Sequence, residues 1–254
     1  MLKKIISWNM HGASGSFKTH ERAWEWLTRN SDVDICLLQE VIPNEEHLRS
    51  WSSHVFSAKR ELPRWGTMIL VRDGQLQKFE PTLHTPWLKR FECSSPVARH
   101  DASDLILCSV HSSYSAVDVK NDELPKDLLR ATSAKIWEIE LIAYDFKSIF
   151  ADQLFIFGGD LNSSIQIDEN RGYGNNRKLF ENLKDYGFLD TRLPFYNNEQ
   201  PTYFKGGEKP FQLDHIFSDE KTSKQIRSWE VFPEIVAEEK LSDHAPIVIE
   251  VETT

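Results

Sequence analysis

The stretch GGDLNS, residues 158–163, decides how the rest of the chain is interpreted. It follows the short apolar run LFIF, residues 154–157, which is typical of a buried strand that turns at two glycines. Asp160 and Asn162 then lie at the carboxyl end of that strand, where ligands bind in α/β proteins. A carboxylate and a carboxamide two residues apart can orient a water molecule and donate to a phosphoryl oxygen. Tight turns favour the same residue types, so the stretch by itself indicates a turn and a catalytic site about equally.

Length and composition predict one globular domain that spans residues 1–254, because no linker, repeat or low-complexity segment divides the chain. No apolar run approaches the roughly 20 residues that a membrane span needs, and the first residues do not form a signal peptide. Cys36, Cys93 and Cys108 cannot all pair within the chain, which fits a reducing compartment. We therefore expect a cytoplasmic monomer without stable membrane insertion. The formal charge of -9 argues against binding nucleic acid by bulk attraction, but it leaves turnover of nucleic acid open.

Apolar, strand-like runs of the chain repeatedly end in polar residues. The run from Lys3 to Asn9 predicts a first strand, Thr19 to Asn30 a helix capped by Thr19, and Asp34 to Val41 a second strand. This order is typical of an open α/β site. A single Asp or Asn at such a place is more often a cap or turn residue than a catalytic one. The residues that recur at strand ends are Asn9, Glu40, His111, Asp160 with Asn162, Asp214, and Asp243 with His244.

The segments between these runs carry weaker patterns. Lys59 to Trp65 is interpreted as a basic loop and residues 79–100 as irregular, because three prolines interrupt them. Apolar spacing from about Pro125 to Phe150 predicts one long helix or two shorter ones. Asp168 to Lys178 is expected to be a loop that enters a helix ending at Gly187, and residues 201–204 and 212–217 are expected to pair as strands.

Five short motifs occur in a fixed order from the first strand to the last: SerTrpAsn, LeuGlnGlu, GlyGlyAspLeuAsn, LeuAspHisIle and SerAspHisAlaPro. Together they resemble the endonuclease/exonuclease/phosphatase superfamily, which includes deoxyribonuclease I and exonuclease III. The resemblance extends from Asn9 to His244, nearly the whole chain. It implies an α/β fold, a four-layer α/β sandwich of two packed mixed β-sheets flanked by helices, with the site at one edge.

The resemblance also implies a metal site and its ligands. Glu40 is the expected principal ligand of Mg²⁺, with Asn9 and Asp243 contributing directly or through water. The chemistry agrees, because Mg²⁺ prefers carboxylate and carbonyl oxygen and keeps several waters. Mn²⁺ is an expected substitute for it.

The remaining motif residues imply hydrolysis of a phosphoester by in-line attack of water. Asp160 is expected to position or deprotonate the water, and Asn162 to donate to the phosphoryl oxygens as charge develops. Asp214 is expected to hold His244 in the right tautomer, so that His244 can act on the phosphate or the nucleophile.

His111 bears on the subclass. In relatives that resemble deoxyribonuclease I or the sphingomyelinases, a histidine here contacts the scissile phosphate and can protonate the leaving oxygen; Glu61 is a candidate to orient it. At two positions the chain lacks an arginine that some relatives have. SerSerPro at 94–96 stands where some relatives have an arginine before proline, and His215 stands where the inositol phosphatase branch has an arginine, so His215 is interpreted as structural.

The leading functional hypothesis is a Mg²⁺-dependent nuclease that hydrolyses DNA phosphodiesters, with nucleic acid as its substrate. Basic and aromatic loops that could track a backbone support it: Lys59 to Trp65, Trp87 to Arg90, and Arg171 with Tyr173 as candidate substrate-binding residues. The alternative is a phosphodiesterase or phosphatase for a smaller phosphoester such as a lipid headgroup, a nucleotide or a protein-nucleic acid adduct. A third hypothesis, an inactive binding module, is disfavoured because every expected carboxylate, amide and histidine is present.

Overall fold

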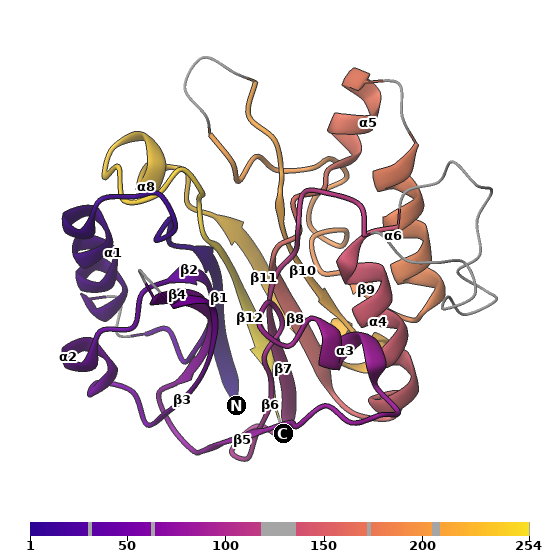
Figure 1. Ribbon diagram of the computed structural model, residues 1–254, viewed down its shortest axis with the longest axis horizontal. Coiled ribbons are helices and arrows are strands. Elements are labelled where there is room, and N and C mark those ends of the chain that lie inside the picture. The colour runs from indigo at the N-terminus through magenta and orange to yellow at the C-terminus, as the bar shows by residue number, and fades with distance from the viewer. Residues whose placement is uncertain (30–31, 62–63, 118–135, 172–173, 205–208, 254) are drawn as a thin grey trace.

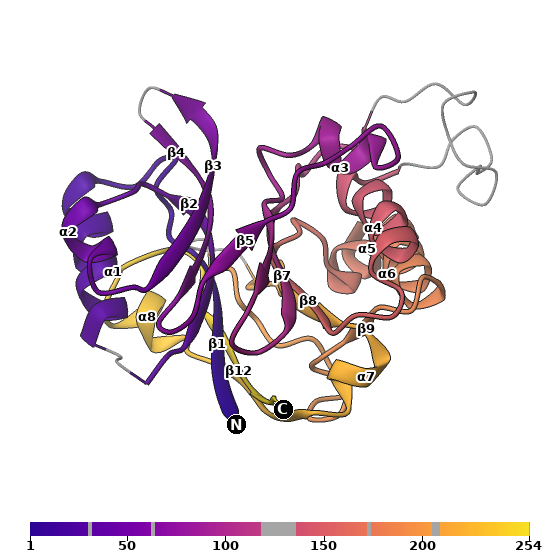
Figure 2. The ribbon, with the colours of Figure 1, turned by 90° about the horizontal axis from the view of Figure 1, so that it is seen from below.

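The computed structural model describes residues 1–29, 32–61, 64–117, 136–171, 174–204 and 209–253. Two six-stranded sheets face each other, and helices lie outside both (Figures 1 and 2). Their strand orders are β11-β12-β1-β2-β4-β3 and β5-β6-β7-β8-β10-β9. The strands are β1 (Leu2–Asn9), β2 (Ile35–Val41), β3 (Ser53–Glu61), β4 (Arg64–Val71), β5 (Leu76–Lys78), β6 (Val97–His100), β7 (Leu105–His111), β8 (Phe155–Asp160), β9 (Leu189–Asp190), β10 (Asp214–Ser218), β11 (Ile226–Val231) and β12 (Ile247–Glu252).

Both sheets are mixed. β1 and β2 are parallel in the first sheet, as are β7 and β8 in the second, and the other strand pairs are antiparallel. Parallel neighbours bring their carboxyl ends to one edge of a sheet. β10 runs antiparallel to β8, so its first residue, Asp214, lies opposite the last residue of β8, Asp160. This edge lies away from the two chain ends, which meet at the opposite side of the sandwich (Figure 1).

Three hydrophobic clusters account for the layers. Side chains from the inner faces of both sheets form the central cluster, with Ile5, Leu37 and Ile249 facing Leu107 and Ile156. A second cluster packs α1 against the outer face of the first sheet, and a third packs α4 and α6 against the second sheet. Burying both faces of a sheet explains the near-continuous apolar runs of the sequence. The expected four-layer α/β sandwich with two packed mixed sheets flanked by helices is confirmed.

The helices follow the expected positions only in part. They are α1 (Phe17–Arg29), α2 (Glu45–Leu48), α3 (Pro86–Arg90), α4 (Glu138–Ile149), α5 (Ile165–Arg171), α6 (Asn175–Asp185), α7 (Glu220–Ser223) and α8 (Glu234–Ala237). α1 buries Trp24 and Leu27 as predicted, but it begins before Thr19, because the Ser16 Oγ accepts the Thr19 N–H at 3.1 Å. α6 ends before Gly187 as expected, and Gly187 has φ +90°. No helix of the described residues is long and apolar enough to cross a membrane.

Several loop predictions were wrong. Lys59 and Trp65 lie in strands β3 and β4, where alternation along a hairpin was obscured by the charged side chains. Residues 79–100 contain α3, for which Pro86 supplies the first turn, and strand β6. Asp168 lies inside α5, and its carboxylate accepts the N–H of Arg177 at 2.8 Å.

The expected strand pair at residues 201–204 and 212–217 is also wrong. Within the described part of the chain Tyr203 forms isolated β-bridges to Phe211 and His244, while β10 pairs with β8 and β9. The first half of the predicted 125–150 helix lies largely outside the described residues, and α4 accounts for the second half. Tyr173, most of the 205–210 loop and the side chains of Arg171 and Glu61 also lie outside the described part.

Candidate active site

The polar residues predicted at strand ends converge on one edge of the sandwich. Pairing of β7 with β8 places His111 beside Asp160, and pairing of β10 with β8 places Asp214 on the other side of Asp160. The Ser242 Oγ donates to the Asn9 backbone oxygen at 2.7 Å, which holds the Asp243 and His244 turn at the end of β1. A 550 Å³ pocket opens there, and its lining includes Glu40, His111, Asp160, Asn162, Asp243 and His244.

Backbone strain is concentrated in this pocket. Five described non-glycine residues have left-handed conformations, and three of them, His11 (φ +56°), Glu40 (φ +47°) and Asn162 (φ +51°), line it. Glu40 lies where the pairing of β2 with β4 shifts register between Leu38 and Val41, as in a β-bulge. Such conformations cost about 1–3 kcal/mol each and persist where the surrounding structure fixes them. The irregularity redirects the Glu40 carboxylate toward the pocket.

The GGDLNS stretch is both a turn and part of the pocket. At Gly159 (φ +155°) a Cβ atom would lie 1.8 Å from the Val110 backbone oxygen, so only glycine allows β8 to approach β7 there. The Asp160 Oδ1 accepts the backbone N–H of Asn162 at 2.9 Å, and the Asn162 Nδ2 donates to the Ser112 backbone oxygen at 2.9 Å. These bonds fix the turn and leave Asp160 Oδ2 facing the pocket.

A buried chain of ionisable groups links Asp214, His244 and Asp160. The His244 Nδ1 is 2.8 Å from Asp214 Oδ2, and its Nε2 is 3.9 Å from Asp160 Oδ2. Burial opposes a charge on His244, but attraction to Asp214 and Asp160 raises its pKa. Burial, reinforced by repulsion from Asp214, raises the pKa of Asp160. A protonated His244 between the two carboxyl groups follows from both shifts.

Asn9 orients the carboxylates of Glu40 and Asp160. Its Nδ2 lies 3.1 Å from Asp160 Oδ2 and 3.4 Å from Glu40 Oε1. Its Oδ1 accepts the backbone N–H of His11 at 2.9 Å, while the Glu40 Oε2 accepts the N–H of Ala13 at 3.0 Å. The β1–α1 loop therefore holds both Asn9 and Glu40.

His111 is held as a neutral imidazole. Burial, with the nearby charge of Lys59, lowers its pKa well below the ordinary histidine value. Its Nε2 lies 3.6 Å from Glu40 Oε1 and 4.0 Å from Asp160 Oδ2. The side chain of Glu61, predicted to orient His111, lies outside the described residues, and the carboxylates found near His111 are Glu40 and Asp160.

The donor set of the pocket fits a hard divalent cation. Among the described residues Asp160, Asp214 and His244 place ligand atoms within 4.8 Å of one another, but His244 and Asp214 are already hydrogen bonded to each other. Glu40 and Asp243 remain as pocket-lining carboxylates, and Asp243 Oδ1 pairs with His11 Nδ1 at 2.8 Å. Carboxylate oxygens with room for water suit Mg²⁺ or Mn²⁺.

Sequence reasoning missed several pocket residues, among them His11, Glu138 and Tyr203, whereas Lys59 and Trp65 belong to the basic and aromatic segment that it had singled out. The Lys59 Nζ donates to the His111 backbone oxygen at 2.9 Å, and the Trp65 ring lies 5.6 Å from the His111 ring. The Tyr203 ring lies 4.8 Å from that of His244. Only His11 carried a sequence signal, since it follows Asn9 by two residues at a strand end. By contrast His215 is buried and bonds the Ser163 backbone oxygen at 2.9 Å, which agrees with its structural interpretation.

Solved structures share this fold across nearly their whole length. A Neisseria 3′ phosphatase, NExo, bound to a product DNA hairpin, has a TM-score of 0.74 at 18% identity, covering 98% of this chain and 99% of that chain. An AP endonuclease from Archaeoglobus fulgidus has a TM-score of 0.71 at 16% identity, covering 99% and 100%. The endonuclease domain of TRAS1, a telomere-specific non-LTR retrotransposon, has a TM-score of 0.62 at 19% identity, covering 100% and 99%.

Sequence comparison places the chain in a family. No curated protein matches it. The model of the endonuclease/exonuclease/phosphatase family, however, matches residues 6–244, a range that includes Asn9, Glu40, Asp160, Asp214 and His244. The chain therefore belongs to the endonuclease/exonuclease/phosphatase family.

Proposed function

We propose that this protein is a divalent-metal-dependent phosphodiesterase that hydrolyses DNA, acting as a monomer with one domain over residues 1–254. The observation that carries the proposal is the buried chain Asp214–His244–Asp160 opening on Glu40 in one pocket. It combines a carboxylate that can orient water, a cationic imidazole for a phosphate, and a carboxylate for a metal ion.

Asp160 orients the attacking water and takes its proton as the new oxygen–phosphorus bond forms and the leaving oxygen departs. Its raised pKa places proton transfer nearer to neutral pH than an ordinary carboxylate would. Asn9 supports this role, because its Nδ2 hydrogen bond at 3.1 Å fixes Asp160 Oδ2.

His244 and Asn162 stabilise the charge that develops on the phosphoryl oxygens. Asp214 binds the His244 Nδ1, so the Nε2–H of His244 points toward the pocket as a donor. The Asn162 amide uses one hydrogen for the Ser112 backbone oxygen and keeps a second for substrate. His111, being neutral, contributes a hydrogen bond to the phosphate or the leaving oxygen rather than a full positive charge.

Glu40 and Asp243 are the residues that would hold the metal ion, with Asn9 acting through the Glu40 carboxylate or a water molecule. When bound, Mg²⁺ or Mn²⁺ would neutralise phosphate charge and favour departure of the leaving oxygen.

DNA is the favoured substrate class because the structural neighbours include a 3′ phosphatase bound to a DNA hairpin and an AP endonuclease. Aromatic and basic side chains at the pocket mouth, Trp65 and Lys59, could contact a nucleotide. The charge of -9 instead favours the second candidate, a smaller phosphoester.

The two candidates are tested by assaying one preparation with Mg²⁺ on duplex DNA with an abasic site, DNA with a 3′-phosphate, supercoiled plasmid and a soluble phosphodiester such as bis-p-nitrophenyl phosphate. We expect cleavage of one or more DNA substrates that EDTA abolishes and that rising salt slows. Cleavage of the small ester alone, insensitive to salt, would support the second candidate, and no cleavage of any substrate would refute both.

A further inference from the structure

His20 lies on the buried face of α1, where it is 4% exposed. Ala23, Trp24 and Leu27 follow it on that face at helical spacing, and the face packs on the outer side of the first sheet. A polar ring buried among apolar side chains needs hydrogen-bond partners, because it has lost those that water would provide. The partners of His20 are backbone groups of two other segments.

The contacts of His20 fix its tautomer. The Ile42 N–H, which can only donate, lies 2.9 Å from His20 Nε2. Nε2 is therefore the unprotonated nitrogen, and the proton on Nδ1 donates to the Met10 backbone oxygen at 3.3 Å. The Ile42 backbone oxygen is satisfied separately, since it accepts the Trp24 indole N–H at 3.0 Å. Burial lowers the pKa of His20, which agrees with a neutral ring that uses one nitrogen as donor and the other as acceptor.

The two backbone groups that His20 bonds belong to the two strand ends that carry site residues. Met10 directly follows Asn9 at the end of β1. Ile42 directly follows the last residue of β2 and lies two residues after Glu40. The His20 ring therefore joins the ends of two parallel strands at the edge of the sheet where the pocket opens.

The segment around Glu40 needs such a restraint. Glu40 has φ +47°, and a left-handed backbone persists only where the surrounding structure holds it. On one side, the Gly12 N–H donates to the Glu40 backbone oxygen at 2.8 Å, and a Cβ atom on Gly12 would lie 2.1 Å from that oxygen. On the other side, the bond from Ile42 to His20 holds the chain just after Glu40.

We propose that His20 is a positioning residue for hydrolysis, because its two nitrogens fix the strand ends from which Asn9 and Glu40 reach the pocket. Its effect is transmitted through these two side chains. The inference rests on the proposed metal-dependent function, in which Glu40 holds the ion. Residues that orient metal ligands from behind typically change metal affinity or activity by about 10- to 100-fold when they are removed.

Four full-length proteins test the proposal: the wild type, His20→Gln, His20→Leu and Leu27→Ala. Glutamine keeps one acceptor and one donor, as the neutral imidazole does, whereas leucine has neither. Leu27→Ala is the matched control, since it destabilises the same helix face without removing the bonds of His20.

The readouts are Mn²⁺ affinity by titration, the Mg²⁺ dependence of hydrolysis, and hydrogen exchange of the Ile42 amide in the metal-free protein. For His20→Leu we expect about tenfold weaker Mn²⁺ affinity, a higher Mg²⁺ concentration for half-maximal rate, and faster Ile42 exchange. His20→Gln should remain close to the wild type in all three. Leu27→Ala should lower the urea midpoint but keep the Mn²⁺ affinity. In the wild type, a long-range ¹H–¹⁵N spectrum should show His20 protonated at Nδ1, which tests the contacts without any variant.

Four results would overturn the assignment. A proton on His20 Nε2 in the wild type would remove the bond from Ile42. Wild-type Mn²⁺ affinity and rate in His20→Leu would show that the strand ends do not depend on this ring. An equal loss of affinity in Leu27→Ala would trace the effect to stability alone. Protection of Ile42 without recovery of affinity in His20→Gln would separate the bond from the site.

Failure of the proposed function would be recognised separately. A wild type that binds no Mn²⁺ and whose hydrolysis EDTA does not inhibit would refute the metal-dependent function. The ring spectrum and the exchange of Ile42 in metal-free protein would still decide whether His20 holds the two strand ends.

Discussion

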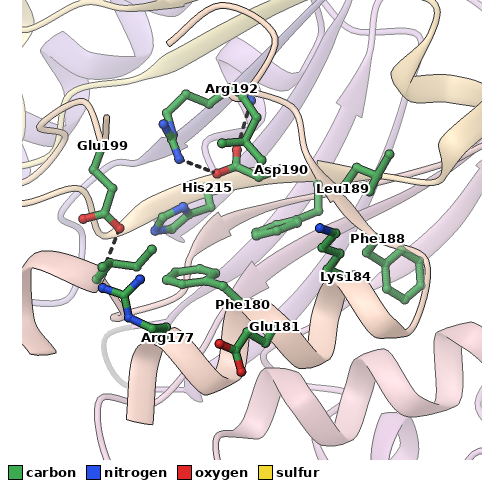
Figure 3. A pocket seen from close by; sticks show the side chains of 13 residues that line it. Arg177, Phe180, Glu181, Lys184, Phe188, Leu189, Asp190, Arg192, Glu199 and His215 are labelled. Atoms are coloured by element: carbon green, nitrogen blue, oxygen red, sulfur yellow. Dashed lines mark hydrogen bonds and ion pairs between the residues drawn. The ribbon is translucent and has the colours of Figure 1, made fainter. Parts of the chain in front are cut away.

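Strand β10 lies between two pockets that differ in how their charged groups are held. Asp214 is bonded to His244 at the catalytic pocket, whereas the next residue, His215, faces a 270 Å³ pocket between the second sheet and α6 (Figure 3). In that second pocket His215 lies beside the Phe180 ring, and Arg192 is paired with Asp190 at 3.0 Å. Glu199 accepts the backbone N–H of Ile165 at 2.8 Å.

Groups of the catalytic pocket have shifted pKa values or strained backbone conformations. Burial raises the pKa of Asp160 and lowers that of His111, and Glu40 and Asn162 have left-handed backbones. Apolar packing on the outer face of β10 stabilises the fold, whereas the strained and buried polar groups at the edge where β8 and β10 meet destabilise it. Variants on the two sides should therefore separate stability from catalysis.

The largest effect is expected on the apolar side. Phe217→Ala should lower the free energy of unfolding by about 3–5 kcal/mol, because it removes a fully buried ring and leaves a cavity. Phe217 stacks on Phe157 at 5.2 Å and on Phe180 at 6.1 Å. Urea unfolding measures the loss, with Phe217→Leu as a smaller-volume control. The rate per folded molecule, measured well below the unfolding midpoint, should stay near that of the wild type, and a large fall would show that the two pockets are not separable.

Asp160→Asn should lower the rate of hydrolysis without lowering stability. The rate of phosphoester hydrolysis should fall on the order of 10²-fold or more, because the group that orients and deprotonates water is lost. Stability should be unchanged or higher, since a buried carboxyl that resists ionisation is replaced by a neutral amide.

Asp145→Asn is the matched control for Asp160→Asn. Burial also raises the pKa of Asp145, to about 6, and its carboxylate accepts the N–H groups of Trp87 and Leu88 away from the catalytic pocket. We expect an unchanged rate in this variant. Full activity in Asp160→Asn would contradict the proposed mechanism.

The pH dependence of stability should report the proton on His244 in the catalytic pocket. The pKa of folded His244 is raised to about 10, so the folded state holds a proton that the unfolded state loses above about pH 6.5. Its stabilising contribution is complete below about pH 6.5 and is lost as the pH rises toward 10. Unfolding with EDTA present should therefore show stability falling over this range, and His244→Gln should flatten the slope. An equal slope in both proteins would remove His244 as its source.

The sequence predicted the strand-end residues of the site better than it predicted the loops. Asp160 ends an apolar run, Asp214 begins one and His244 shortly precedes one, and pairing of β8 with β10 places Asp214 beside Asp160. The site residues Lys59 and Trp65 were placed in a loop because their hairpin is charged and partly exposed.

His11 was missed for a different reason. Its contact with Asp243 joins residues 232 positions apart through a turn in the left-handed conformation, and neither periodicity nor propensity reports such a contact. The same limit applies to the neutral state of His111, which depends on burial and on Lys59 rather than on local sequence.

The smallest effect, from Glu199, tests how far the two pockets are independent. Glu199 accepts hydrogen bonds from the Ser164 hydroxyl at 2.6 Å and from the N–H groups of Ile165 and Gln166, so it caps α5 directly after the GGDLNS turn. Glu199→Ala should lower the free energy of unfolding by about 1 kcal/mol, as other caps do, and Glu199→Gln should lose less because an acceptor oxygen remains.

Hydrolysis rates decide what this loss means. If both variants retain wild-type rates, Asn162 is positioned by its own bonds to Asp160 and Ser112, and the apolar pocket acts only on stability. A graded fall in rate, larger for Ala than for Gln, would instead show that α5 helps to position Asn162. The outer face of β10 would then contribute to catalysis, and the separation between the pockets would hold for charge but not for geometry.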